Sequence, residues 1–280
     1  MRRLITVLAI AFGWLAVTAH AAETRITWHG HATFEVVTPK GVVLMIDPWL
    51  GNPKNPAAGK DPIAQVKRLD YILLSHGHSD HIADAAALAK KTGAQLVAIP
   101  ELGAQMVKLK GYPQKQFGIA TSMNMGGEIS IAEGEVRVAM TDAKHSGGMD
   151  NPFAADDPKA PAMVYAGNPV GLVIRVAGGP TLYHTGDTDY FADMSYIGER
   201  YAPDLALLSA GDHFTMGPVV AARAAKAVQA RTAVPMHWGT FPVLAQDMDE
   251  FVAEAKRLDV TTRVIQPGET LVFEGKTLKR

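Results

Sequence analysis

The sequence predicts one domain of the α/β class, and three observations lead to this prediction. Short apolar runs typical of buried strands recur along the chain, and segments with helical character separate several of them. Several of the apolar runs end directly in histidine or aspartate. No internal repeat and no linker interrupts the chain, so residues 22–280 are expected to fold together as a single domain.

Composition narrows the possible functions. The chain has 280 residues, of which 48% are hydrophobic and 20% are charged, and this is enough apolar material for a large core. The formal net charge of −1 gives no sign of binding to nucleic acid or to an anionic membrane surface, so a small-molecule substrate is expected. The chain contains no cysteine, which leaves histidine, aspartate and glutamate as the available metal ligands.

The first 21 residues have the features of a secretory signal peptide. Two arginines follow the initiating methionine, residues 4–17 are almost entirely apolar, and the sequence Ala-His-Ala then matches a signal-peptidase site. Cleavage is expected after Ala21, with Ala22 as the alternative. An N-terminal membrane anchor is the other interpretation, but the apolar run is short for a span. The mature protein is therefore expected in the periplasm or outside the cell, without a stable membrane anchor.

The most informative stretch lies between a strand-like apolar run and an Ala-rich helical run at residues 82–91. Three of the chain's 10 histidines, His76, His78 and His81, occur there together with Asp80. Residues two apart point the same way in an extended segment, so His76 and His78 share one side. Asp80 and His81 fall where the helix begins and can face a second point nearby. The alternative is a polar turn that caps the helix, but a cap does not require three histidines. The turn therefore predicts ligands for two adjacent metal ions.

Three closely spaced strands are predicted at residues 24–28, 32–37 and 42–46, which suggests an antiparallel start to the mature chain. His31 lies in the first turn, and it either lines the metal site or is a half-buried polar residue at a strand end. Asp47 ends the third strand. It either orients a ligand imidazole from behind or makes a turn with the proline that follows.

The remaining elements alternate between strands and helices, with two long loops between them. Further strands are predicted at residues 71–74, 94–99, 136–140, 170–176, 181–183, 205–208, 233–236 and 270–273, and further helices at 101–109, 218–229 and 247–258. Residues 52–62 are rich in Pro, Gly, Asn and Lys and are expected to form a surface loop. Residues 147–168 are irregular but carry Met149, Phe153 and Tyr165, so they form either an apolar lid beside the metal site or a mobile insertion.

Other candidate ligands also follow predicted strands. His145 comes at such a position and is the natural third ligand of the first metal ion. Asp187 is expected to bridge the two ions, because a carboxylate has two oxygens whereas an imidazole cannot bind two cations in this way. His237 completes the second ion's ligands. Three further residues are expected to face the substrate or to support the ligands from behind: His184, Asp212 and His213.

The motif His-x-His-x-Asp-His, followed in order by a histidine, an aspartate and another histidine, resembles the metallo-β-lactamase superfamily over residues 24–280. The resemblance implies a four-layer αββα sandwich with a two-metal site at one edge. The first ion would be held by His76, His78 and His145. The second would be held by Asp80, His81 and His237, with Asp187 bridging the two.

Within that superfamily the chain is most similar to the uncharacterised bacterial metal-dependent hydrolases related to L-ascorbate-6-phosphate lactonase. The likeness rests on Ile-Asp-Pro at residues 46–48, Tyr-His-Thr-Gly-Asp-Thr at 183–188, Gly-Asp-His-Phe-Thr-Met-Gly-Pro at 211–218 and Met-His-Trp-Gly-Thr at 236–240. The export signal departs from that branch, so a sugar-phosphate substrate does not follow. β-Lactamases of the commonest zinc class are less similar, because they place a cysteine in the second site.

The resemblance implies a hydrolase that uses two divalent metal ions, Zn²⁺ first and Mn²⁺ as the alternative. A hydroxide bridging the ions would attack an ester, lactone or phosphodiester bond, and Asp80 would carry the leaving group's proton in addition to binding metal. Two other functions remain open. One is an iron-dependent redox enzyme of the same fold, since histidine and carboxylate ligands also suit iron, and the other is a non-catalytic metal-binding protein.

Overall fold

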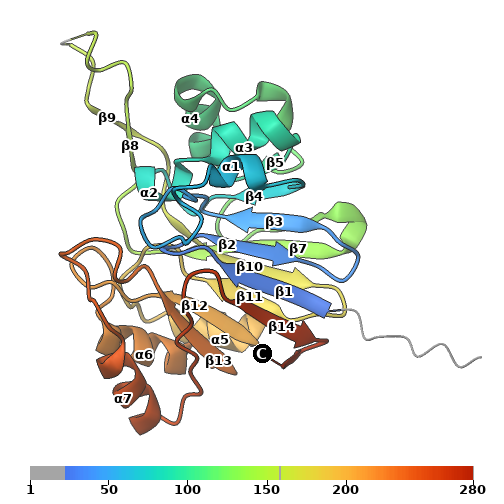
Figure 1. The fold of residues 1–280 in the computed structure, drawn as a ribbon, viewed down its shortest axis with the longest axis vertical. Helices are drawn as coiled ribbons and strands as arrows, with labels where there is room; N and C mark the ends of the chain where they lie inside the picture. The colour runs from blue at the N-terminus through green and yellow to red at the C-terminus, as the bar shows by residue number, and fades with distance from the viewer. Residues whose placement is uncertain (1–22, 158, 280) are drawn as a thin grey trace, which may run out of the picture.

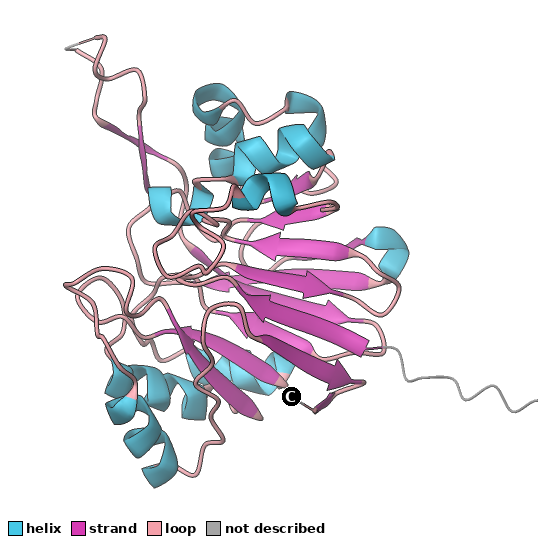
Figure 2. Cartoon of the chain, in the orientation of Figure 1, coloured by secondary structure: helices cyan, strands magenta, loops and turns pink. Residues whose placement is uncertain are grey.

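The structure is a computed structural model, which describes residues 23–157 and 159–279. Within these ranges two β-sheets pack face to face, and helices lie on the outer side of each sheet (Figure 1, Figure 2). The predicted αββα sandwich is therefore confirmed. The predicted signal peptide lies outside the described residues and stays a prediction. Among the helices of the described ranges, none combines the length and the apolar character needed to cross a membrane.

The first sheet begins with the antiparallel strands that the N-terminal spacing predicts. In sheet order it runs β15 (Thr277–Leu278), β14 (Thr270–Glu274), β1 (Glu23–Trp28), β2 (Phe34–Val37), β3 (Val43–Ile46), β4 (Tyr71–Leu73) and β5 (Gln95–Val97). β2 pairs antiparallel with both β1 and β3, whereas β3, β4 and β5 pair in parallel. The carboxyl ends of β1, β3 and β4 therefore lie at one edge of the sheet.

The second sheet repeats this arrangement with other strands. In sheet order it runs β13 (Thr232–Met236), β12 (Leu205–Ser209), β11 (Thr181–His184), β10 (Val170–Val176), β7 (Val136–Asp142) and β6 (Glu128–Ile131). β11, β12 and β13 pair in parallel, and β10 is antiparallel to both β11 and β7. β7, β11, β12 and β13 therefore point the same way, and the segments that follow them leave the sheet at one edge.

Helices cover both outer faces of the sandwich. Beside β4 and β5 lie α3 (Ala85–Thr92) and α4 (Pro100–Lys110), and the second sheet carries α5 (Met194–Tyr201), α6 (Pro218–Ala227) and α7 (Asp249–Arg257) (Figure 1). Shorter helical segments are α1 (Pro62–Gln65), α2 (Ser79–Ile82), η1 (Gln114–Gln116) and η2 (Ala132–Gly134).

Strand β12 illustrates how the sequence fills both sides of a buried sheet. Its side chains alternate, so Leu205 and Leu207 enter the core between the sheets, whereas Ala206 and Leu208 lie under the helices with Met194 and Phe251. All of these side chains are at most 1% exposed. The continuous apolar run that predicts this strand therefore reflects burial on both faces.

The helix predicted at residues 82–91 is interrupted in the structure. α2 ends at Ile82 and α3 begins at Ala85. Between them, the carboxylate of Asp84 accepts hydrogen bonds from the backbone N–H groups of Leu50 and Gly51. This tertiary contact fixes the chain where local helix propensity alone would continue the helix.

The two predicted long loops contain more order than their composition indicates. Residues 147–168 include the paired strands β8 (Gly148–Asp150) and β9 (Met163–Tyr165), which form a hairpin that projects from the body (Figure 1). In the loop at 52–62, Asn52 is fully buried, and its side-chain amide donates hydrogen bonds to the carbonyl oxygens of His29 and Trp49. The Asn52 side-chain amide thus satisfies backbone carbonyl groups that no strand or helix partner of the described ranges reaches.

Gly198 gives a test of the packing between α5 and α6. A Cβ at this position would lie 2.7 Å from the carbonyl carbon of Val228, which follows α6. Gly198→Ala is therefore expected to lower the free energy of unfolding by about 1–3 kcal/mol through overpacking. Because alanine also brings about 1 kcal/mol to a helix interior, the net loss measured should be up to about 2 kcal/mol. Urea titration measures the change.

Gly118→Ala is the matched control, because a Cβ there meets nothing within 4 Å. Its free energy of unfolding should stay within about 0.5 kcal/mol of the parent protein. Equal unfolding midpoints for the two variants would mean that α5 can move away from α6 without cost, and the packing argument would then be wrong.

Candidate metal centre

Polar side chains from the ends of several strands meet at one edge of the sandwich. They follow β4, β7, β11 and β13, and the set comprises His76, His78, Asp80, His81, His145, Asp187 and His237. The shared direction of the strands within each sheet explains why residues far apart in sequence converge there. All seven residues that the sequence predicts as metal ligands therefore lie together.

His76, His78 and His145 form the first group. Their ring nitrogens lie within 4.8 Å of one another. Nε2 of His145 is 3.2 Å from Nδ1 of His78, and Nε2 of His76 is buried without a hydrogen-bond partner in the described residues. Three imidazole nitrogens that converge in this way can coordinate one cation.

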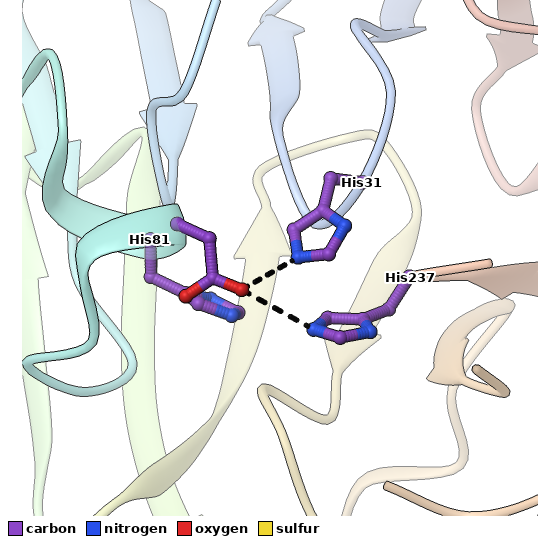
Figure 3. Close-up of side chains that lie close together, drawn as sticks. His31, His81 and His237 are labelled. Carbon is purple, nitrogen blue, oxygen red and sulfur yellow. Dashed lines mark hydrogen bonds and ion pairs between the residues drawn. The ribbon is translucent and has the colours of Figure 1, made fainter. Parts of the chain in front are cut away.

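Asp80, His81 and His237 form the second group, with His31 beside them (Figure 3). Oδ2 of Asp80 lies 3.8 Å from Nε2 of His237. The Nε2 atoms of both His81 and His237 are buried, and among the described residues they contact the Asp187 carboxylate without forming a well-aligned hydrogen bond. Buried polar atoms normally have well-aligned partners, so nitrogens and a carboxylate that converge without such hydrogen bonds indicate a group that binds between them.

Asp187 lies between the two groups. Its side chain is 3% exposed, and Oδ2 is 3.0 Å from Nε2 of His237 and 3.3 Å from Nε2 of His81. The same oxygen is 3.7 Å from Nε2 of His145, which belongs to the first group. Oδ1 is buried and has no hydrogen-bond partner in the described residues. One carboxylate is therefore within reach of ligand atoms from both groups.

The charges of the centre fit a cation. Burial alone would raise the pKa of Asp187, but His237 and His81 hold that pKa well below its usual value. Burial would also lower the pKa of His81, but Asp187 and Asp47 raise it well above the ordinary value. Burial lowers the pKa of His76 well below normal, which favours the neutral imidazole that metals bind. The carboxylates that favour a proton on His81 would equally favour a divalent cation in its place, and together with the neutral imidazole of His76 they form a donor set suited to divalent metals.

Asp47 supports the centre from behind, as the sequence predicts in one of its two interpretations. Its buried carboxylate accepts a hydrogen bond from Nδ1 of His81 over 2.8 Å. It also accepts hydrogen bonds from the backbone N–H and the hydroxyl of Ser75. The carboxylate thus keeps the proton of His81 on Nδ1 and leaves Nε2 available as a ligand atom.

His31 reaches the centre from the turn after β1. Its ring is fully buried, Nε2 lies 2.9 Å from Oδ2 of Asp80, and Nδ1 lies 3.0 Å from the hydroxyl of Thr240. The ring centroid is 3.7 Å from that of His237. Burial and the neighbouring His237 lower the pKa of His31 to about 4. His31 therefore holds Asp80 in place as a neutral side chain.

The structure does not bring the other three predicted residues into the group. His184 is buried, its Nε2 donates to the carbonyl oxygen of Ala32, and its Nδ1 accepts from the N–H of Gly186. It therefore fixes the turn that precedes Asp187. Asp212 and His213 have positive φ angles, are exposed, and do not line the cavity described below. Their loop bends away after β12, which the sequence pattern alone does not reveal.

A cavity of about 340 Å³ opens over the centre. Its lining adds four residues to the predicted ligands: Ser79, Ser146, Asp150 and Phe214. In the sequence, Asp150 belongs to an irregular loop and Phe214 to a longer motif, and neither pattern marks the residue as part of the site. Their closeness to His145 and His213 along the chain is the one signal that points to them. A second cavity, of about 360 Å³, is lined by His29 and Glu35 and by no predicted site residue.

Comparisons with known proteins agree with this geometry. Residues 43–238 match the family described as the beta-lactamase superfamily domain. A UPF0173 metal-dependent hydrolase of Thermodesulfovibrio yellowstonii is 45% identical over 276 residues, which cover 98% of this chain and 100% of that protein. A second, from Anaeromyxobacter sp. (strain K), is 47% identical over 256 residues, which cover 91% of this chain and 89% of that protein.

A solved structure of a metallo hydrolase is also similar to this chain. Igni18, a metallo hydrolase from the archaeon Ignicoccus hospitalis, superposes with a TM-score of 0.75 at 34% identity. The match covers 90% of this chain and 98% of that chain. The predicted fold and the predicted hydrolase class are confirmed by these similarities. The chain therefore belongs to the metallo-β-lactamase superfamily and is a metal-dependent hydrolase within it.

Proposed function

We propose that this chain is an exported hydrolase that holds two divalent metal ions and cleaves an ester, lactone or phosphodiester bond. Zn²⁺ is the first choice and Mn²⁺ the alternative, because histidine and carboxylate ligands suit both. The position of Asp187 carries the proposal. Its Oδ2 lies 3.0 Å from Nε2 of His237 and 3.7 Å from Nε2 of His145, so one carboxylate reaches both ligand groups.

Divalent ions held by these residues would lower the pKa of a bound water and polarise the bond to be cleaved. The chain's own residues orient the ligand side chains and transfer the proton. Asp47 orients the buried ring of His81. Asp80 lines the cavity, and its Oδ2 pairs with His31, which leaves its second oxygen to bind metal or to pass the proton of the attacking water to the leaving group.

Export is the part of this proposal that depends on the sequence alone. The basic start, the apolar run and the Ala-His-Ala site at residues 19–21 support cleavage by signal peptidase. Expression of the full chain with its own leader should deliver a periplasmic or secreted protein. Mass spectrometry of that protein should give a mature chain that begins at Ala22.

Elemental analysis of the exported protein tests the metal proposal. About two equivalents of zinc or manganese are expected per chain, as in other two-metal sites. His78→Ala should lose at least one of them, because it removes a member of the first group. His213→Ala is the matched control, since this exposed histidine does not line the cavity, and it should keep the full metal content.

Three results would overturn the proposal. Iron in place of zinc or manganese would favour a redox function. A metal content no higher than that of the His78→Ala variant would rule out the first group as ligands. Two bound ions without hydrolysis of any lactone, ester or phosphodiester in a broad panel would contradict the proposed bond classes.

A further inference from the structure

The charged lining of the metal cavity is entirely acidic. Asp80, Asp150 and Asp187 contribute carboxylates, and no lysine or arginine of the described residues lines the cavity. Lys144 lies next to His145 in sequence, but its ammonium group pairs with Asp142 on the outside. Lys159, the one basic residue of the hairpin loop, does not line the cavity either. The divalent ions of the proposed function would neutralise the carboxylates of Asp80 and Asp187 that hold them, which leaves Asp150 as the carboxylate of this lining with no cation beside it.

Asp150 is held at the cavity by the base of the β8–β9 hairpin. Side chains alternate along β8, so the fully buried Met149 faces the core while Asp150 faces the opposite side. A Cβ on Gly77 would lie 3.2 Å from Cβ of Met149 and 3.1 Å from the carbonyl oxygen of Gly148. The hairpin base therefore packs directly on the turn that carries His76 and His78, and this contact fixes Asp150 relative to the metal centre.

The carboxylate of Asp150 has no hydrogen bond or ion pair with the described residues, and it is not one of the grouped metal ligands. A substrate that covers this carboxylate removes part of its water shell, which costs free energy unless a complementary charge replaces it. A cationic group on the substrate offsets that cost, whereas an anionic group adds repulsion. The ring of Phe214, 56% exposed in the same cavity, is a further surface that attracts cations.

We propose that Asp150 is a specificity-determining residue that selects substrates with a positively charged amine or ammonium group near the scissile bond. The inference rests on the proposed hydrolytic function and narrows it to substrates that carry a cationic group beside the bond to be cleaved. Asp150 takes no part in bond cleavage. Because its attraction acts on the bound substrate and on the transition state alike, its removal should raise KM more than it lowers kcat.

Two esters of equal shape test the proposal. They are acetylcholine, the acetate ester of choline, and 3,3-dimethylbutyl acetate, in which carbon replaces the ammonium nitrogen. The parent protein should give a kcat/KM about fivefold higher for the cationic ester, the upper range for a solvent-exposed ion pair. Asp150→Asn should bring the ratio of the two values close to one, mainly through KM. Asp156→Asn removes a carboxylate from the same hairpin outside the cavity and should leave the ratio as in the parent protein.

Binding of the corresponding ethyl ethers, which cannot be hydrolysed, separates this inference from the hydrolytic function. Calorimetry should show tighter binding of the choline ether to the parent protein and to Asp156→Asn, and equal binding of the two ethers to Asp150→Asn. That result would support the charge selection even if neither acetate is cleaved, in which case only the hydrolysis of such esters would be refuted. Equal affinities in the parent protein, no binding of either ether, or an unchanged preference in Asp150→Asn would each overturn the assignment of Asp150.

Discussion

Replacing Asp187 by alanine is expected to abolish the metal centre and to lower kcat by at least about 10³-fold, which corresponds to several kcal/mol of transition-state stabilisation. The carboxylate is 3% exposed and lies within 3.7 Å of imidazole nitrogens from both ligand groups. No other carboxylate of the described residues lies within 4.0 Å of His145. Removing it leaves His81 and His237 without their shared negative partner, so the proposed cations would lose a central ligand.

The measurement combines elemental analysis with turnover of whichever substrate the panel identifies. Asp189→Ala is the matched control, because this exposed aspartate lies two residues along the chain and does not line the cavity. It should keep the metal content and kcat of the parent protein. If Asp187→Ala keeps both metal ions and its activity, the bridging role of Asp187 is refuted.

The convergence of the candidate ligands could be predicted because the strands that carry them are recognisable in the sequence. Apolar runs such as β4 and β13 are buried on both faces, so their ends are visible in the sequence, and a polar residue directly after them lies at a sheet edge. His76 and His237 follow such runs. The spacing within the central turn also indicates two facing directions, and the structure brings His78 and Asp80 to different groups.

What the sequence could not predict depends on contacts between distant segments. His31 stays ambiguous in the sequence because either interpretation suits a strand end, and only the pairing of its ring with Asp80 and Thr240 resolves its position. Asp150 is missed because its place depends on Met149 packing against Gly77, which lies far away along the chain. The break between α2 and α3 depends in the same way on the hydrogen bond that the Asp84 carboxylate accepts from the N–H of Leu50. In each case a tertiary contact overrides or completes a local pattern.

Replacing Asp47 by asparagine is expected to weaken metal affinity by about 10- to 100-fold, the usual effect of losing the partner of a ligand histidine. Three donors converge on this fully buried carboxylate: the N–H and the hydroxyl of Ser75, and Nδ1–H of His81. An amide of the same size has only one acceptor oxygen. If the NH₂ group of the asparagine takes the place of Oδ1, it faces the backbone N–H of Ser75, so that two donors oppose each other. If it replaces Oδ2, it faces Nδ1–H of His81.

The second orientation has the larger chemical consequence. An NH₂ group facing Nδ1 favours moving the imidazole proton of His81 from Nδ1 to Nε2. Nε2 is the buried atom that faces Asp187 in the candidate metal centre. Competition with a chelator measures the affinity, and NMR of the imidazole protons reports which nitrogen of His81 is protonated. Asp70→Asn is the control, because Asp70 also accepts a hydrogen bond from a neighbouring strand, at Val43, but lies outside the metal cavity. It should lower stability without changing metal affinity. If Asp47→Asn does the same, the carboxylate supports only the fold, and the orientation of His81 must have another cause.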